Sequence, residues 1–149
     1  MSRLDSFIRR LLAQRACIDE AAALIAAVPG PLLELGLGNG RTYDHLRERF
    51  PGRDIFVFDR ELAAHPSSRP DLAHFIEGDF RATLPAALPR IRGKAALAHC
   101  DVGSHSREAS RALAAAIAPL LAPLMAEGGI VLGDQPMPYP SWRELPLPD

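Results

Sequence analysis

Apolar residues recur at helical spacing near the start of the chain. They follow the i, i+3, i+4 pattern of one helical face, with Leu4, Phe7, Ile8, Leu11, Leu12, Ile18, Ala22 and Ile25 as members. The Pro29-Gly30-Pro31 sequence ends this pattern, because proline cannot continue a helix. Residues 1–30 are therefore predicted to form an N-terminal helical segment.

Five short apolar runs follow, and each is bounded by polar, glycine or proline residues. They are continuous rather than alternating, which is typical of strands buried on both faces of a parallel sheet. The predicted strands are residues 31–35, 54–58, 72–77, 94–100 and 130–132. Between them we expect a helix at 41–50, an irregular stretch or short helix at 80–92, and a helix from Ser104 or Ser106 to about 126, bent by Pro119 and Pro123. The pattern predicts an α/β fold with a doubly wound, mostly parallel sheet.

Composition limits the partners more than it limits the fold. The 149 residues suit one domain, 1–149, which ends in a proline-rich tail at 135–149. With 18 acidic and 17 basic residues the net charge is −1, so neither nucleic acid nor an anionic membrane is expected as a partner. The charged N-terminus lacks the apolar centre of a signal peptide, and two cysteines make no disulfide framework. We therefore expect a cytoplasmic protein.

A glycine loop or an aspartate follows every predicted strand. The first strand leads into a glycine loop, and the other four end at Asp59, Asp79, Asp101 and Asp134. A single acid after a strand is often only a turn residue or a helix cap. Because the carboxyl ends of parallel strands meet at one edge of the sheet, where such folds bind ligands, the repetition predicts a binding crevice there.

The glycine loop reads GxGxG, with Gly36, Gly38 and Gly40 on alternate positions. A dinucleotide-binding loop has its third glycine one position later, where this chain has Arg41. Lys94 is the only lysine and lies outside any catalytic lysine motif. Both observations disfavour a nicotinamide-dependent dehydrogenase. A tight turn that binds nothing is the alternative interpretation of the loop.

Two acids near this loop suit a nucleoside ligand. Asp59 lies 21 residues after Gly38, where a carboxylate can accept hydrogen bonds from both ribose hydroxyls; a helix cap or surface acid is the alternative. Glu34 lies inside an apolar strand, and burying a carboxylate is costly unless it is paired. Its partner could be the amino group of a ligand, or else a backbone turn or an arginine.

Three segments in this order carry a family resemblance: LELGLGNGRT at 33–42, DIFVFD at 54–59 and IEGDF at 76–80. Over residues 31–134 the chain resembles the S-adenosylmethionine-dependent methyltransferases of the Rossmann-like class. The resemblance implies a Rossmann-like sandwich and S-adenosyl-L-methionine as cofactor. The glycines Gly36, Gly38 and Gly40 would let the backbone approach the cofactor closely.

The resemblance also implies roles for single residues. Glu34 would help to hold the methionine amino end, Asp59 would bind the ribose, and Asp79 would bind the adenine amino group. Phe80 would pack on the adenine ring, although a plain core position is equally compatible with the sequence. The residues around Cys100 and Asp101 would line the sulfonium end.

The acceptor side is less defined. Enzymes that methylate base amino groups often have an Asn/Asp-Pro-Pro-aromatic string after the fourth strand, where this chain reads DVGSH at 101–105. Metal-assisted catechol-type enzymes have an Asp there and an Asp-Asn pair after the fifth strand, which Asp101 and Asp134-Gln135 match in part. Glutamine is a longer side chain than asparagine, so no metal is expected. Asp101 and Asp134 are the predicted catalytic residues.

Two histidines and two aromatic residues each have two possible interpretations. His99 and His105 could each act as a general base. The alternative for His99 is a buried strand residue, and the alternative for His105 is a helix-capping or surface residue. Tyr139 and Trp142 could form a wall of the acceptor pocket or only anchor the tail.

Family members normally continue past the fifth strand into a helix and an antiparallel hairpin. This chain resembles a compact member with a short C-terminus, which leaves a sheet edge for the tail or a second subunit to cover, and a homodimer is one such solution. The predicted function is methyl transfer from S-adenosyl-L-methionine to a small-molecule acceptor. The alternative is a non-catalytic S-adenosylmethionine- or adenosine-binding module or sensor.

Overall fold

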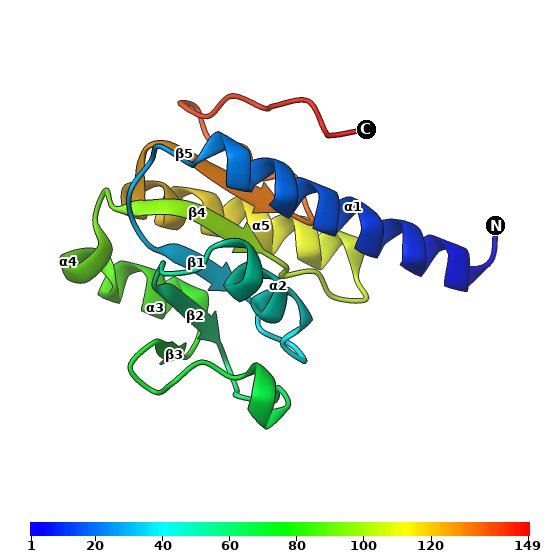
Figure 1. Cartoon of the computed structure of the whole chain (residues 1–149), viewed down its shortest axis with the longest axis horizontal. Helices are drawn as coiled ribbons and strands as arrows, with labels where there is room; N and C mark the ends of the chain where they lie inside the picture. Colours follow the sequence, from blue (N-terminus) through cyan, green and yellow to red (C-terminus); the bar gives the residue numbers. More distant parts are fainter.

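Five parallel strands form the centre of the molecule in the computed structural model, which describes residues 1–149 (Figure 1). The spatial order is β3-β2-β1-β4-β5, so the chain starts in the middle and winds outward in both directions. The strands are β1 (Leu32–Leu35), β2 (Ile55–Asp59), β3 (Phe75–Glu77), β4 (Ala95–Cys100) and β5 (Met125–Gly133). This confirms the predicted doubly wound α/β sheet.

Helices cover both faces of the sheet. One face packs against α1 (Arg3–Leu24) and α2 (Arg41–Arg49), and the other against α3 (Phe80–Ala86), α4 (Leu88–Ile91) and α5 (Arg107–Leu121). Short 3-10 helices, η1 (Pro66–Ser68) and η2 (Ala122–Leu124), complete the elements. Successive β-strand residues point to opposite faces, so Leu32 joins the first core and Leu33 the second. No helix is both long and apolar enough to cross a bilayer.

Two predicted strand boundaries are wrong. The strand expected at 72–77 is only β3, because His74 closes a turn by donating its backbone N–H to the carbonyl and carboxylate oxygens of Asp71. The last strand is longer than the expected 130–132, since β5 starts at Met125 directly after η2. Its ladder with β4 is irregular near Gly128, whose φ of +79° suits glycine.

The predicted helical stripe of α1 is buried only in its second half. Ile18 and Ala21 are buried against the sheet, whereas Leu4 and Leu12 are 66% and 51% exposed. The first half of α1 extends away from the sheet (Figure 1). A capping box between Ser2 and Asp5 holds its start. The helix therefore presents an apolar face that this chain itself does not cover.

The proline-rich tail has no helix or strand after Gly133. Met137 and Trp142 are half-buried and pack against the second core. The rings of Tyr139 and Trp142 lie 5.1 Å apart between centroids. These contacts fit the interpretation in which the aromatic residues anchor the tail.

Candidate functional site

The carboxyl ends of the five strands meet at one edge, because every strand pair is parallel. Backbone hydrogen bonds extend the ladders past the strand ends: the N–H of Asp101 donates to Leu35 O at 3.0 Å, and that of Asp134 to Cys100 O at 3.1 Å. The first strand ends at the glycine loop. The structure thus places the predicted acids along the edge that the sequence indicated.

The three glycines of the loop have different roles. All have positive φ, between +54° and +89°. A Cβ on Gly36 would lie 2.3 Å from Asp101 O, and one on Gly40 would lie 2.6 Å from Ser68 O, so packing within the protein requires both. A Cβ on Gly38 would meet nothing within 4 Å. The backbone at Gly38 is therefore open to a molecule that lies across the loop.

Asp59 ties this loop to the end of β2. Its Oδ2 accepts from the backbone N–H of Leu37 at 2.7 Å and of Gly38 at 3.4 Å, and its Oδ1 accepts from the N–H of Arg60 at 2.6 Å. The side chain is half-buried and caps no helix. Oδ2 already accepts two hydrogen bonds, whereas Oδ1 accepts one and has a second acceptor position. Asp59 can therefore still accept a hydroxyl hydrogen bond from a ligand at Oδ1.

Asp79 has a structural role in addition to any ligand contact. It is the N-cap of α3 and accepts from the N–H of Arg81 at 2.8 Å, and its Oδ2 pairs with Arg60 at 2.9 Å. The Arg81 N–H lowers the pKa of Asp79, and the Arg60 guanidinium adds to this effect. Phe80 is half-buried against the second core. Both observations match the plainer alternatives, and ligand contacts at Asp79 and Phe80 stay predictions.

Glu34 has its partners within the protein. The carboxylate is fully buried, lies 2.5 Å from Nδ1 of His99, and accepts from Thr42 Oγ1 at 2.8 Å. Nδ1 donates, because a carboxylate only accepts. Strand register explains the pairing, since Glu34 of β1 lies beside His99 of β4 on the face covered by α1 and α2. The sequence had suggested an arginine, a turn or a ligand as the partner, and a contact between Glu34 and the methionine amino end of the cofactor stays a prediction.

A residue of α1 extends this buried network to the edge of the sheet. The Gln14 amide nitrogen lies 3.2 Å from His99 Nε2 and donates to Asp101 Oδ2 at 3.4 Å. Burial lowers the pKa of His99, but the Glu34 carboxylate outweighs this and leaves that pKa above its ordinary value. His99 is thus the buried strand residue, and it links Glu34 to the side chain that contacts Asp101. Nothing in the sequence pointed to Gln14.

Asp134 directly follows β5, and its side chain packs against the loop that follows β4. Its Oδ1 accepts from the N–H of Val102 at 3.2 Å, and a Cβ on Gly103 would come within 2.3 Å of its Oδ2. The glycine therefore lets the carboxylate approach the backbone, close to Asp101. No group of three or more His, Cys, Asp or Glu side chains is arranged to hold a metal ion.

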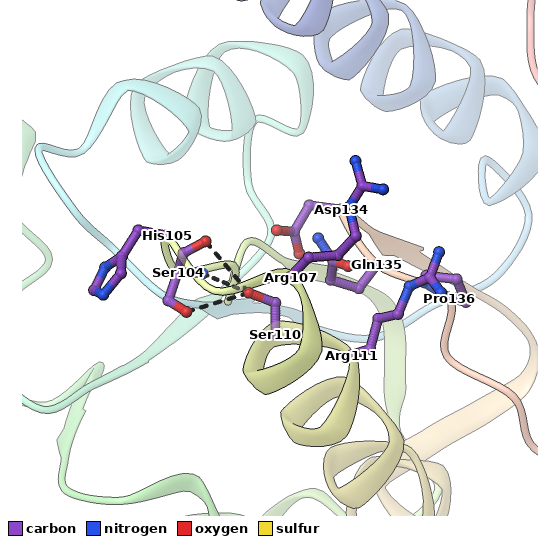
Figure 2. Close-up of a pocket in the computed structure, with 8 residues that line it drawn as sticks. All are labelled: Ser104, His105, Arg107, Ser110, Arg111, Asp134, Gln135 and Pro136. Carbon is purple, nitrogen blue, oxygen red and sulfur yellow. Dashed lines mark hydrogen bonds between the residues drawn. The ribbon is translucent and has the colours of Figure 1, made fainter.

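A polar hollow of about 550 Å³ lies beside Asp134, between the β4–α5 loop and the end of β5. Figure 2 shows its lining, which has no hydrophobic residue: Ser104, His105, Arg107, Ser110, Arg111, Asp134, Gln135 and Pro136. Ser106 rather than Ser104 caps α5, and Ser110 Oγ accepts from the N–H of Ser104 at 2.7 Å. His105 is exposed at the rim. Tyr139 and Trp142 are not among the lining residues.

Comparisons with known proteins agree with this geometry. A family described as S-adenosyl-L-methionine methyltransferase matches residues 1–149. A crystal structure of an S-adenosyl-L-methionine methyl transferase from Silicibacter pomeroyi DSS-3 is 49% identical, with a TM-score of 0.95, and the match covers 99% of this chain and 91% of that one. No curated protein sequence gives a match.

Proposed function

Since the chain belongs to the S-adenosyl-L-methionine methyltransferase family and uses that cofactor, we propose that it transfers the methyl group to a small-molecule acceptor. The observation that supports this acceptor class is the polar hollow of about 550 Å³ that Asp134 helps to line. That volume suits a small ligand. The net charge of −1 offers no general attraction to nucleic acid.

The residues at the strand ends fit the cofactor. The open backbone at Gly38 leaves room for a close approach, and the Asp59 carboxylate beside it has a free acceptor position on Oδ1 for a ribose hydroxyl. The arginine that pairs with Asp79 is exposed, so it can move aside when the adenine amino group approaches. When bound, S-adenosyl-L-methionine supplies an activated methyl group on its sulfonium.

Asp101 and Asp134 are the proposed catalytic residues. They orient the nucleophilic atom of the acceptor and accept its proton as it is methylated. Asp101 is held by Gln14, and Asp134 by the N–H of Val102. Fixed carboxylates at the acceptor side position the nucleophile, which accounts for most of the catalysis when the methyl donor is already activated.

Methyl transfer from radiolabelled S-adenosyl-L-methionine to a panel of small oxygen, nitrogen and carbon nucleophiles tests the proposal. We expect product with at least one class and none with oligonucleotides. Methylation of an oligonucleotide alone would contradict the small-molecule acceptor. Cofactor binding without transfer to any acceptor would favour the non-catalytic module.

We also propose a homodimer, supported by the first half of α1. Its exposed apolar side chains form one stripe: Leu4, Phe7, Ile8 and Leu12. A twofold axis would place the same stripe of a second copy against it, because a symmetric dimer uses one patch twice. A cytoplasmic location is proposed from the two free cysteines, since oxidising compartments favour disulfides.

A further inference from the structure

Two arginines project into the polar hollow without protein partners. Arg107 and Arg111 are one helical turn apart on α5, so their side chains share one face. Figure 2 shows both guanidinium groups on the same side of the helix, at the end of β5. Neither forms an ion pair in the structure. Each carries five N–H donors in a fixed fork.

The serines that line the hollow have hydrogen-bond partners within the protein. Ser110 Oγ accepts from the Ser104 N–H at 2.7 Å and donates to Ser106 O at 2.8 Å, which holds the β4–α5 loop against α5. The Asp134 carboxylate turns toward the same loop, where it accepts from the Val102 N–H. Among the charged side chains of the hollow, the two arginines are therefore the ones without a protein partner.

The chemistry of the lining restricts the ligand. A hollow without hydrophobic side chains offers little to an uncharged aromatic or aliphatic molecule. Two guanidinium groups suit an oxyanion, because their forks match carboxylate and phosphate oxygens. The one carboxylate of the lining, Asp134, leaves the two arginines in excess.

We propose that the methyl acceptor carries a carboxylate or phosphate group, and that Arg107 and Arg111 bind this group beside Asp134. The anion would anchor the acceptor, and its nucleophilic atom would face the two acids. This inference rests on the proposed small-molecule function and names the substrate class for the same site.

Calorimetric titration with inorganic phosphate and, separately, with acetate tests the anion site. Each titration is run on the wild type with and without S-adenosylhomocysteine. We expect one phosphate or acetate to bind per chain, and the stronger of the two indicates which anion the acceptor carries. R107Q and R111Q are each expected to weaken that binding about tenfold, since charge-assisted hydrogen bonds are lost. The control, R92Q, changes an exposed arginine before β4, at the opposite edge of the sheet.

The outcomes separate the two proposals. Binding that weakens about tenfold in R107Q and R111Q but is unchanged in R92Q, with unchanged affinity for S-adenosylhomocysteine, supports the anion site. Absence of binding by both anions, or equal weakening in R92Q, overturns it. Methyl transfer to small neutral molecules only would also overturn it while leaving the small-molecule function intact. Absence of methyl transfer to any small molecule would instead contradict the proposed function, whatever the anions do.

Discussion

Glu34 and His99 form a buried pair across two adjacent strands, with 2.5 Å between Glu34 Oε1 and His99 Nδ1. The glutamate is fully buried and the histidine nearly so. Thr42 from α2 and Gln14 from α1 complete the hydrogen bonds of the pair. The network joins both helices of one face to the floor of the site, so it contributes to stability and to the position of Asp101.

The first prediction concerns the stability of this pair. Replacing Glu34 with alanine leaves His99 without its charged partner, and we expect a loss of about 3 kcal/mol in the free energy of unfolding. T42V is the control, because it removes only one hydrogen bond to the same carboxylate and is expected to cost about 1 kcal/mol. Urea unfolding measures both values. Equal losses would show that the Glu34–His99 pair adds nothing beyond an ordinary hydrogen bond.

The second prediction concerns pH. The pKa of His99 lies above its ordinary value of 6.5, so its contribution to stability is full below 6.5 and is lost as the pH rises through the folded-state pKa. The groups that face His99 are Glu34, Asp101, Asp134 and Gln14. The stability difference between wild type and H99Q is therefore expected to be larger at about pH 6 than at about pH 9. If the stability difference between wild type and H99Q grows with pH instead, folding lowers the pKa of His99 rather than raising it.

Much of this site could be predicted from the sequence because its residues follow strands. The glycine loop, Asp59, Asp101 and Asp134 lie where continuous apolar runs end, and parallel strands bring such ends together. The pairing of Glu34 with His99 could not be predicted, since it depends on the β1–β4 register. The one available signal was a polar residue inside each of two apolar runs.

Other features depend on tertiary packing, which the pattern of apolar residues in the sequence does not reveal. The stripe of α1 predicts an apolar face, but not that its first half lies beyond the sheet. The early start of β5 depends on an irregular ladder at Gly128, which the sequence showed only as a glycine pair. The hollow at Arg107 and Arg111 forms only when α5 packs beside the end of β5.

The third prediction concerns the catalytic residues. D101N and D134N remove the carboxylates proposed to accept the acceptor's proton, and we expect each to lower the rate of methyl transfer about a hundredfold. Their affinity for S-adenosylhomocysteine is expected to be unchanged. The control is D149N, an exposed acid at the end of the tail. Wild-type rates in both D101N and D134N would show that neither carboxylate acts as a general base.

The fourth prediction concerns assembly. Glutamate at Leu4 and Ile8 places charges in the exposed stripe of α1, and burying an unpaired charge opposes association. We expect a dimer for the wild type and a monomer for the L4E/I8E variant by analytical ultracentrifugation. The control, L72E, changes an exposed leucine outside α1. A wild type that is monomeric at all concentrations, or a dimer that persists in L4E/I8E, would contradict the proposed interface.

Asp59 links the glycine loop to β2 and is the predicted ribose ligand, so its removal tests the cofactor site most directly. D54A is the matched control, because Asp54 precedes the same strand at the opposite edge of the sheet. Isothermal titration calorimetry with S-adenosylhomocysteine is predicted to give roughly micromolar affinity for wild type and D54A, and about a hundredfold weaker binding for D59A. NAD is predicted not to bind. Unchanged affinity in D59A, or wild-type binding of S-adenosylhomocysteine no tighter than millimolar, would contradict a cofactor site at Asp59 and the glycine loop.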